Sequence, residues 1–146
     1  MHLGVNLITG ATGHIGNVLA RQLSCAGAPV RALVLPGEDL TPLRGLDVEL
    51  VEGNLLDYAS LLAAMQQIDT VYHLAGAISI LPGRDPNLHL VNVVGTRNVL
   101  CAFKQSGARR MLYTSSIHAL RRIPHGAVVD ESLPYDPDNP YGAYDR

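Results

Sequence analysis

Short runs of apolar residues alternate with segments of helical periodicity along most of this chain. Apolar runs of about four to eight residues are typical of buried strands, and apolar residues spaced three and four apart are typical of amphipathic helices. The pattern predicts strands over Leu3–Thr9, Val30–Leu35, Val48–Glu52, Thr70–Leu74 and Met111–Ser115. Strands that alternate with helices indicate an α/β fold with a parallel sheet and right-handed crossovers.

Helix-capping residues accompany the helical segments between these strands. Gly27 is a plausible C-cap for a first helix, whose apolar face comprises Ile15, Leu19, Leu23 and Ala26. Asp57 is expected to cap the N-terminus of a second helix, which continues through Leu61, Leu62 and Met65. A longer third helix ends at Gly107, and one of its faces comprises Val91, Val94, Asn98, Cys101 and Ala102. The pattern predicts a short helix or loop from Glu38 to Arg44, and a long loop, of a length that is usually functional, over His118–Pro140.

Composition and charge narrow the class of protein. The chain has 146 residues, of which 47% are hydrophobic, with a formal net charge of -2. It carries no basic stripe for nucleic acid and no apolar stretch long enough to span a bilayer, and its N-terminus lacks a signal-peptide layout. We expect Cys25 and Cys101 to be buried thiols in a reducing compartment, hence a cytoplasmic location, with a disulfide or metal role as the alternative.

A glycine-rich loop follows the first predicted strand and opens the first predicted helix. It reads Thr9-Gly10-Ala11-Thr12-Gly13-His14-Ile15-Gly16. Glycines in this arrangement permit a sharp turn, a close approach of the backbone to a pyrophosphate, and tight packing of the helix on the strand. The helix N-terminus adds free N–H groups and the positive end of a dipole. The loop therefore predicts a dinucleotide-binding site.

The end of the second predicted strand bears on the choice of cofactor. A carboxylate about 20 residues past the glycine loop would accept from the adenosine ribose, and a basic residue would favour a 2′-phosphate. The segment Val34-Leu35-Pro36-Gly37 offers neither, and Glu38 and Asp39 are interpreted mainly as turn residues. The cofactor is therefore expected to be NAD(P), with a slight preference for NADP because no carboxylate ends this strand.

Small residues also follow the third and fourth predicted strands, in Gly53–Asp57 and in Leu74-Ala75-Gly76. Small residues at the carboxyl end of a parallel strand allow a ligand to lie across the edge of the sheet. His73 precedes the second of these segments, and we interpret it as a packed core histidine, with a catalytic role as the alternative. The six histidines show no metal-ligand spacing, so no metal site is expected.

Two further motifs make a resemblance specific. Thr114-Ser115-Ser116 closes the fifth predicted strand, and Pro140-Tyr141-Gly142-Ala143-Tyr144 lies near the end of the chain. Together with the glycine loop, Gly53–Asp57, His73–Gly76 and Asn92–Val99, they resemble, in order, the N-terminal part of the extended short-chain dehydrogenases/reductases. This is the NAD-dependent epimerase/dehydratase superfamily, and the sequence leans toward its dihydroflavonol-reductase-like branch.

The resemblance implies a catalytic serine and tyrosine, matched here by Ser116, with Ser115 less favoured, and by Tyr144. Tyr141 does not match, because Asp145 stands where a lysine would be required. The lysine partner of Tyr144 would fall two residues beyond Arg146 and is absent from this chain. That lysine matters because a tyrosine hydroxyl titrates near pH 10, and a nearby ammonium stabilises its anion.

The resemblance also implies cofactor contacts outside the glycine loop, at Asn54, Leu55, Leu74, Ala75, Gly76, Asn92 and Thr114. Asn54 departs from the family, in which an aspartate accepts from the adenine amino group, although an asparagine oxygen can still accept. Asn92 matches an asparagine of the family's long helix, and a helix-capping or core polar role is the alternative.

The fold that this resemblance implies is a Rossmann-type doubly wound parallel sheet. Residues 1–146 are expected to form an NAD(P)-binding domain that is incomplete at its C-terminus, without the family's later strands and small substrate domain. The implied function is hydride transfer to or from a carbonyl or secondary alcohol of a small molecule, with no nucleic-acid or membrane partner. Three alternatives stay open: a nucleotide-sugar epimerase/dehydratase, a non-catalytic dinucleotide-binding sensor and, for the assembly, a homodimer.

Overall fold

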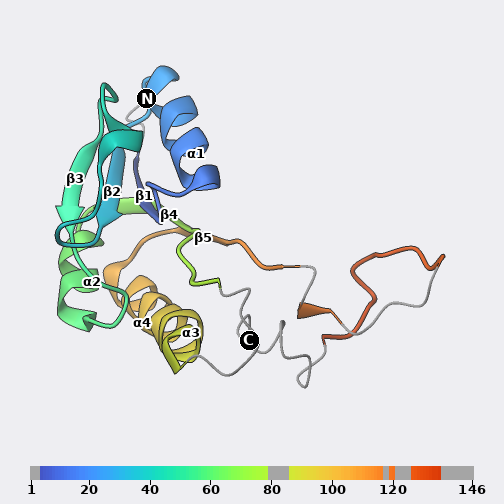
Figure 1. Cartoon of the computed structure of the whole chain (residues 1–146). Coiled ribbons are helices and arrows are strands. Elements are labelled where there is room, and N and C mark those ends of the chain that lie inside the picture. The colour runs from blue at the N-terminus through green and yellow to red at the C-terminus, as the bar shows by residue number, and fades with distance from the viewer. Residues whose placement is uncertain (1–3, 79–85, 117–118, 121–125, 136–146) are drawn as a thin grey trace.

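A computed structural model describes residues 4–78, 86–116, 119–120 and 126–135. Its sheet is parallel and has the strand order β3-β2-β1-β4-β5 (Figure 1). The strands are β1 (Val5–Thr9), β2 (Val30–Val34), β3 (Glu49–Glu52), β4 (Ile68–His73) and β5 (Arg110–Tyr113). The chain starts in the middle of the sheet, builds outward to β3, and then returns to the other side of β1. The parallel doubly wound sheet predicted from sequence is therefore confirmed, and each predicted strand differs from the observed one by a few terminal residues.

The helices are α1 (His14–Cys25), α2 (Tyr58–Ala64), α3 (Pro86–His89) and α4 (Thr96–Ser106). A 3-10 turn, η1 (Thr41–Leu43), lies between β2 and β3, and a π-helix, η2 (Leu90–Gly95), joins α3 to α4. The Asp57 carboxylate caps α2 by accepting from the Ala59 and Ser60 backbone N–H groups. Gly107 ends α4 at a φ of 78°, so both caps predicted from sequence are present.

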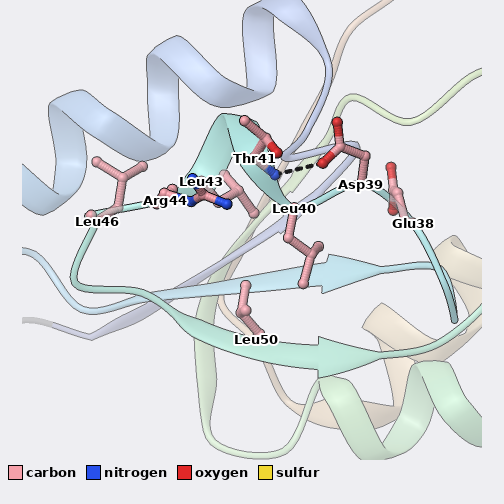
Figure 2. A pocket seen from close by; sticks show the side chains of 9 residues that line it. Glu38, Asp39, Leu40, Thr41, Leu43, Arg44, Leu46 and Leu50 are labelled. Atoms are coloured by element: carbon pink, nitrogen blue, oxygen red, sulfur yellow. Dashed lines mark hydrogen bonds between the residues drawn. The ribbon is translucent and has the colours of Figure 1, made fainter.

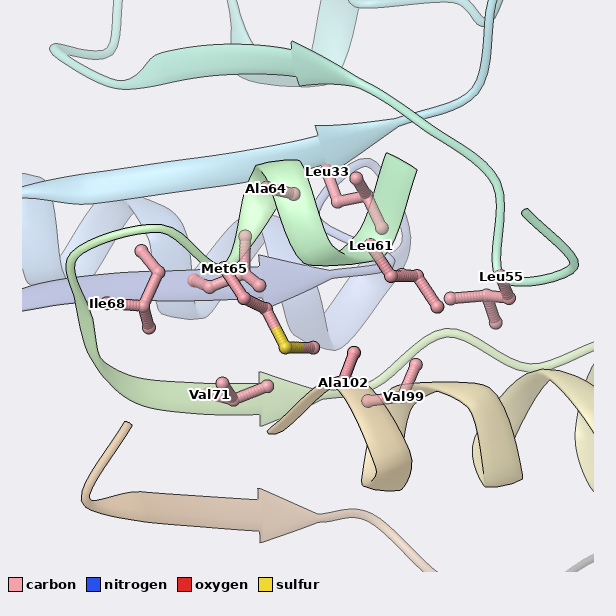
Figure 3. Packing of buried hydrophobic residues seen from close by; sticks show 10 residues of the cluster. Leu33, Leu55, Leu61, Ala64, Met65, Ile68, Val71, Val99 and Ala102 are labelled. Carbon is pink, nitrogen blue, oxygen red and sulfur yellow. The ribbon is translucent and has the colours of Figure 1, made fainter. Parts of the chain in front are cut away.

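Two apolar layers cover the two faces of the sheet. Leu7 of β1 and Val71 of β4 point toward α2 and α4, where they pack with Met65, Val99 and others (Figure 3). The next residue of β1, Ile8, points the opposite way and packs with Ala20 of α1. Successive side chains of a strand face opposite sides of the sheet. One strand therefore contributes to both layers, and both faces of β1 are buried.

The cysteines correct a prediction made from sequence. Cys25 and Cys101 are both exposed free thiols, not buried ones. Cys25 is the last residue of α1, at the end that carries only loop residues beyond it. Cys101 lies one position before Ala102, which is buried, and one residue turns a side chain about 100° around an α-helix. An apolar neighbourhood in the sequence therefore did not place either thiol in the core.

Candidate functional site

The glycine loop lies at the carboxyl end of β1, in the middle of the sheet. Gly10 has a φ of +73°, and a Cβ there would lie 2.7 Å from the Ala75 backbone nitrogen. A Cβ on Gly16 would lie 2.0 Å from the Gly10 carbonyl oxygen, so α1 packs directly on the turn. Gly10 and Gly16 thus have the turn and packing roles that the sequence predicts.

Gly13 differs from the other two glycines of the loop. It is the exposed N-cap of α1, and a Cβ there would meet only the Gly10 carbonyl oxygen, at 3.3 Å. The first turn of α1 contains no acidic residue, and its leading N–H groups have no acceptor within the helix. The space over Gly13, together with these donors and the dipole of a 12-residue helix, fits a phosphate group.

The carboxylate of Glu38 lies against the glycine loop, at the carboxyl end of β2. Its Oε1 accepts from the Thr12 hydroxyl, and its Oε2 accepts from the Leu35 backbone nitrogen at 2.8 Å. The chain turns back through Pro36 and Gly37, whose φ is +77°, and the Glu38 backbone nitrogen donates to the Leu35 carbonyl. The turn therefore returns a carboxylate to the strand end, where the sequence analysis had found none.

This finding corrects the interpretation of Glu38 as mainly a turn residue. A proline followed by a glycine is the signature of a turn that brings its first and last residues together, and this signal could have located Glu38. Asp39 does have only a turn role, because its Oδ1 accepts from the Thr41 backbone nitrogen at 2.9 Å. The same hydrogen bonding to Thr41 lowers the pKa of the Asp39 carboxyl.

A hollow of about 580 Å³ lies beyond β2 and β3, next to η1. Figure 2 shows Leu40 and Leu50 turned toward each other across it, with Glu38 at its far side. The lining residues are Glu38, Asp39, Leu40, Thr41, Leu43, Arg44, Gly45, Leu46 and Leu50. Glu38 alone among them contacts the glycine loop, so we place the candidate site along the carboxyl ends of the strands and not in this hollow.

The β3 end carries Asn54 in a tightly hydrogen-bonded loop. Asn54 is exposed, and its Oδ1 accepts from the Leu56 backbone nitrogen at 2.9 Å. Leu55 is 7% exposed and belongs to the core beneath α4. Its carbonyl oxygen accepts from Asn98 Nδ2 at 2.9 Å. The helix that follows β4 therefore holds the loop that follows β3.

His73 ends β4 and is fully buried. Its Nδ1 lies 2.7 Å from Thr9 Oγ1 and its Nε2 lies 3.0 Å from Thr96 Oγ1, and its ring stacks on Tyr113. Burial lowers the pKa of His73 to about 4, so the ring is neutral at physiological pH. The prediction of a packed core histidine is confirmed.

The segment after His73 is held from both sides. The Ala75 backbone nitrogen donates to Thr9 Oγ1 at 3.2 Å. Asn92 of η2 clamps Ala77, accepting from its nitrogen at 2.7 Å and donating to its carbonyl oxygen at 2.9 Å. Gly76 lies beside this clamp, because a Cβ there would lie 3.4 Å from Asn92 Oδ1. Asn92 therefore shapes the backbone that passes in front of the glycine loop.

The β5 end holds the predicted serine and threonine. The Thr114 backbone nitrogen donates to the His73 carbonyl at 3.2 Å, which joins the β4 and β5 ends. Ser116 follows two residues later and is exposed, and its carbonyl accepts from the Ala119 nitrogen at 3.0 Å. Tyr144 lies outside the described residues, so its predicted pairing with Ser116 stays a prediction.

Comparison with known proteins agrees with this geometry. Residues 6–144 match the model of the NAD dependent epimerase/dehydratase family. The chain is 39% identical over 137 residues to a Methylococcus capsulatus protein named sterol demethylase protein B, and covers 42% of it. It is 35% identical to a putative dihydroflavonol 4-reductase of Synechocystis, with 94% of this chain and 40% of the relative covered.

Solved structures share the fold. The UDP-glucose 4-epimerase of Thermus thermophilus, crystallised with NAD, superposes with a TM-score of 0.83 at 26% identity, over 97% of this chain and 47% of that one. A short-chain dehydrogenase/reductase superfamily protein of Agrobacterium tumefaciens, with bound NAD, superposes with a TM-score of 0.79 at 33% identity, over 97% and 42%. The chain thus spans about two fifths of the length of the curated relatives that it matches. None of the helices described has the length and hydrophobicity needed to cross a membrane.

Proposed function

Since this chain belongs to the NAD-dependent epimerase/dehydratase family, we propose that it binds a nicotinamide dinucleotide along the carboxyl ends of its strands. The observation that carries the proposal is the open face of Gly13 above the first turn of α1, which offers space and N–H donors to a pyrophosphate. Glu38 and Asn54 would face the adenosine half, and Leu74–Gly76, Asn92 and Thr114 would face the nicotinamide half.

The protein to which these residues belong is proposed to be an oxidoreductase that acts on a carbonyl or secondary alcohol of a small molecule. The cofactor supplies the hydride chemistry when it is bound. Ser116 would position the substrate oxygen, and Tyr144 would hold the proton given to or taken from it. The 146 residues contain no lysine four positions after Tyr144, so we expect this chain alone to bind cofactor weakly at best and to catalyse no turnover.

A second candidate is a nucleotide-sugar epimerase or dehydratase, which the similarity to the Thermus UDP-glucose 4-epimerase supports. The same dinucleotide site serves both candidates, and residues that bind substrate would separate them. A non-catalytic dinucleotide sensor is disfavoured by the presence of both Ser116 and Tyr144. For the location we propose the cytoplasm, because exposed unpaired thiols at Cys25 and Cys101 suit a reducing compartment.

The proposed cofactor is NAD in preference to NADP. The slight preference for NADP rested on the absence of a carboxylate from the β2 end, and Glu38 occupies that end. A carboxylate accepts hydrogen bonds from ribose hydroxyls and repels a 2′-phosphate. The position of Glu38 therefore supports the opposite choice.

Calorimetric titration with NADH and NADPH tests the proposal. Gly13→Val should weaken binding of both by at least about tenfold, because the side chain fills the space over the N-terminus of α1. Gly37→Ala serves as the control, since Gly37 also lies in an exposed turn but its added methyl meets no atom within 4 Å. Equal affinity in the Gly13 variant and the parent would refute the assignment.

A further inference from the structure

The amide of Asn54 has a defined orientation. Its side-chain atom nearest to the Leu56 backbone N–H, at 2.9 Å, has to be the oxygen, because an NH₂ group there would set donor against donor. The NH₂ group is therefore directed away from its own loop, on an exposed residue. Asn54 offers two N–H donors to a ligand, and its acceptor is already engaged.

The loop that carries this amide is built to hold it still. The Asn54 backbone nitrogen donates to Ser60 Oγ at 3.1 Å, and the Asp57 nitrogen donates to the Asn54 carbonyl at 2.9 Å. Asn98 holds the next carbonyl, that of Leu55. Gly95 packs so closely that a Cβ on it would lie 2.9 Å from Leu55 Cβ. The donors are thus presented from a fixed backbone, as a selective contact requires.

The position of the amide fits the base of a dinucleotide. β3 lies two strands from β1 in the sheet, which corresponds to roughly 10 Å between the glycine loop and the β3 end. The Glu38 carboxylate lies at the β2 end between them. A pyrophosphate at the loop and a ribose at Glu38 would bring the purine to Asn54.

We infer that Asn54 sets the base preference of this chain by donating, not accepting, at the purine edge. This inference rests on the proposed dinucleotide binding. Adenine presents an amino donor at C6, which is a mismatch for an NH₂ group, whereas a 6-oxo purine presents an acceptor there. The site therefore tolerates or prefers hypoxanthine over adenine, and an aspartate at this position would reverse the preference.

The test compares NADH with its hypoxanthine analogue, deamino-NADH, by fluorescence titration of the 146-residue chain and of Asn54→Asp. An aspartate oxygen can still accept from the Leu56 N–H, so the loop is retained while the outward donor becomes an acceptor. The added charge affects both dinucleotides alike and cancels in the ratio of their dissociation constants. Glu52→Gln, an exposed change of charge at the end of β3, is the control.

We expect the parent chain to bind deamino-NADH at least as tightly as NADH. We expect Asn54→Asp to shift the ratio toward NADH by about three- to tenfold, the range of one hydrogen bond. Glu52→Gln should leave the ratio unchanged. A ratio that stays within about twofold in Asn54→Asp, with both dinucleotides bound, overturns the inference and leaves dinucleotide binding intact. Failure of the parent chain to bind either dinucleotide refutes the proposed function, and the inference with it.

Discussion

Glu38 accepts a hydrogen bond from the Thr12 hydroxyl, which joins the turn after β2 to the middle of the glycine loop. The second carboxylate oxygen is held by the Leu35 backbone nitrogen at 2.8 Å. A flexible surface glutamate is thereby fixed at the strand end where a ribose would lie. This contact turns the choice between NAD and NADP into a question about one side chain.

Glu38→Gln is expected to lower the preference for NADH over NADPH by at least about fivefold, because the amide removes the charge that repels a 2′-phosphate. The measurement is the ratio of the two dissociation constants. Asp39→Asn is the matched control, since its carboxylate serves only the turn at Thr41. An unchanged ratio in Glu38→Gln, or an equal change in both variants, would show that Glu38 does not face the ribose.

Asn98 connects α4 to the loop after β3 through its 2.9 Å hydrogen bond to the Leu55 carbonyl. Asn98→Ala is expected to lower the free energy of unfolding by about 1–2 kcal/mol, because a partly buried carbonyl loses its donor. Asn98→Asp should cost more, because it sets a carboxylate oxygen against that carbonyl. Urea unfolding measures both values, and the exposed neighbour Arg97→Ala should change stability by less than about 0.5 kcal/mol. The order Ala worse than Asp would contradict the assigned donor.

His73 should make stability depend on pH below neutrality. Burial lowers its pKa from 6.5 to about 4, so between these values the unfolded chain binds a proton that the folded chain does not. Its contribution is fully present above pH 6.5 and is lost as the pH falls toward 4, by about 3 kcal/mol in all. Urea unfolding at several pH values measures this loss.

The control for His73 is the difference between variants. His73→Gln should be less stable at pH 7, because it disturbs the bonds to Thr9 and Thr96, and should show a shallower fall in stability between pH 6.5 and 4. His14→Gln, at the exposed start of α1, should keep the parent's fall. A parallel pH profile for the parent and His73→Gln would mean that this histidine is not the group responsible.

Gly16 and Gly37 separate two reasons for glycine. Gly16→Ala should destabilise the fold by at least about 2 kcal/mol, since the new methyl would lie 2.0 Å from the Gly10 carbonyl oxygen in a packed interior. Gly37→Ala meets open space and should cost only about 1 kcal/mol, for a φ of +77°. Thermal unfolding of both variants checks the order. A Gly16→Ala protein as stable as Gly37→Ala would mean that α1 can move off the turn.

The sequence alone was sufficient for those features that depend on local chemistry. Apolar periodicity located every strand, because burial on both sheet faces demands it over a few consecutive residues. The glycine loop, the Asp57 cap and the Gly107 terminus were likewise predictable, because backbone conformation and helix ends are decided by adjacent residues. The identity of His73 as a core residue followed from its place within a strand pattern.

Only the tertiary structure decided features that depend on where the chain returns and which way a side chain turns. Glu38 reaches the glycine loop because a Pro-Gly turn folds it back onto β2, a contact across 26 positions to Thr12. The polarity of Asn54 depends on which amide atom its loop engages. The exposure of Cys101 depends on a helix face that packing sets, not composition. Such facts arise from long-range geometry, and no short window of sequence contains it.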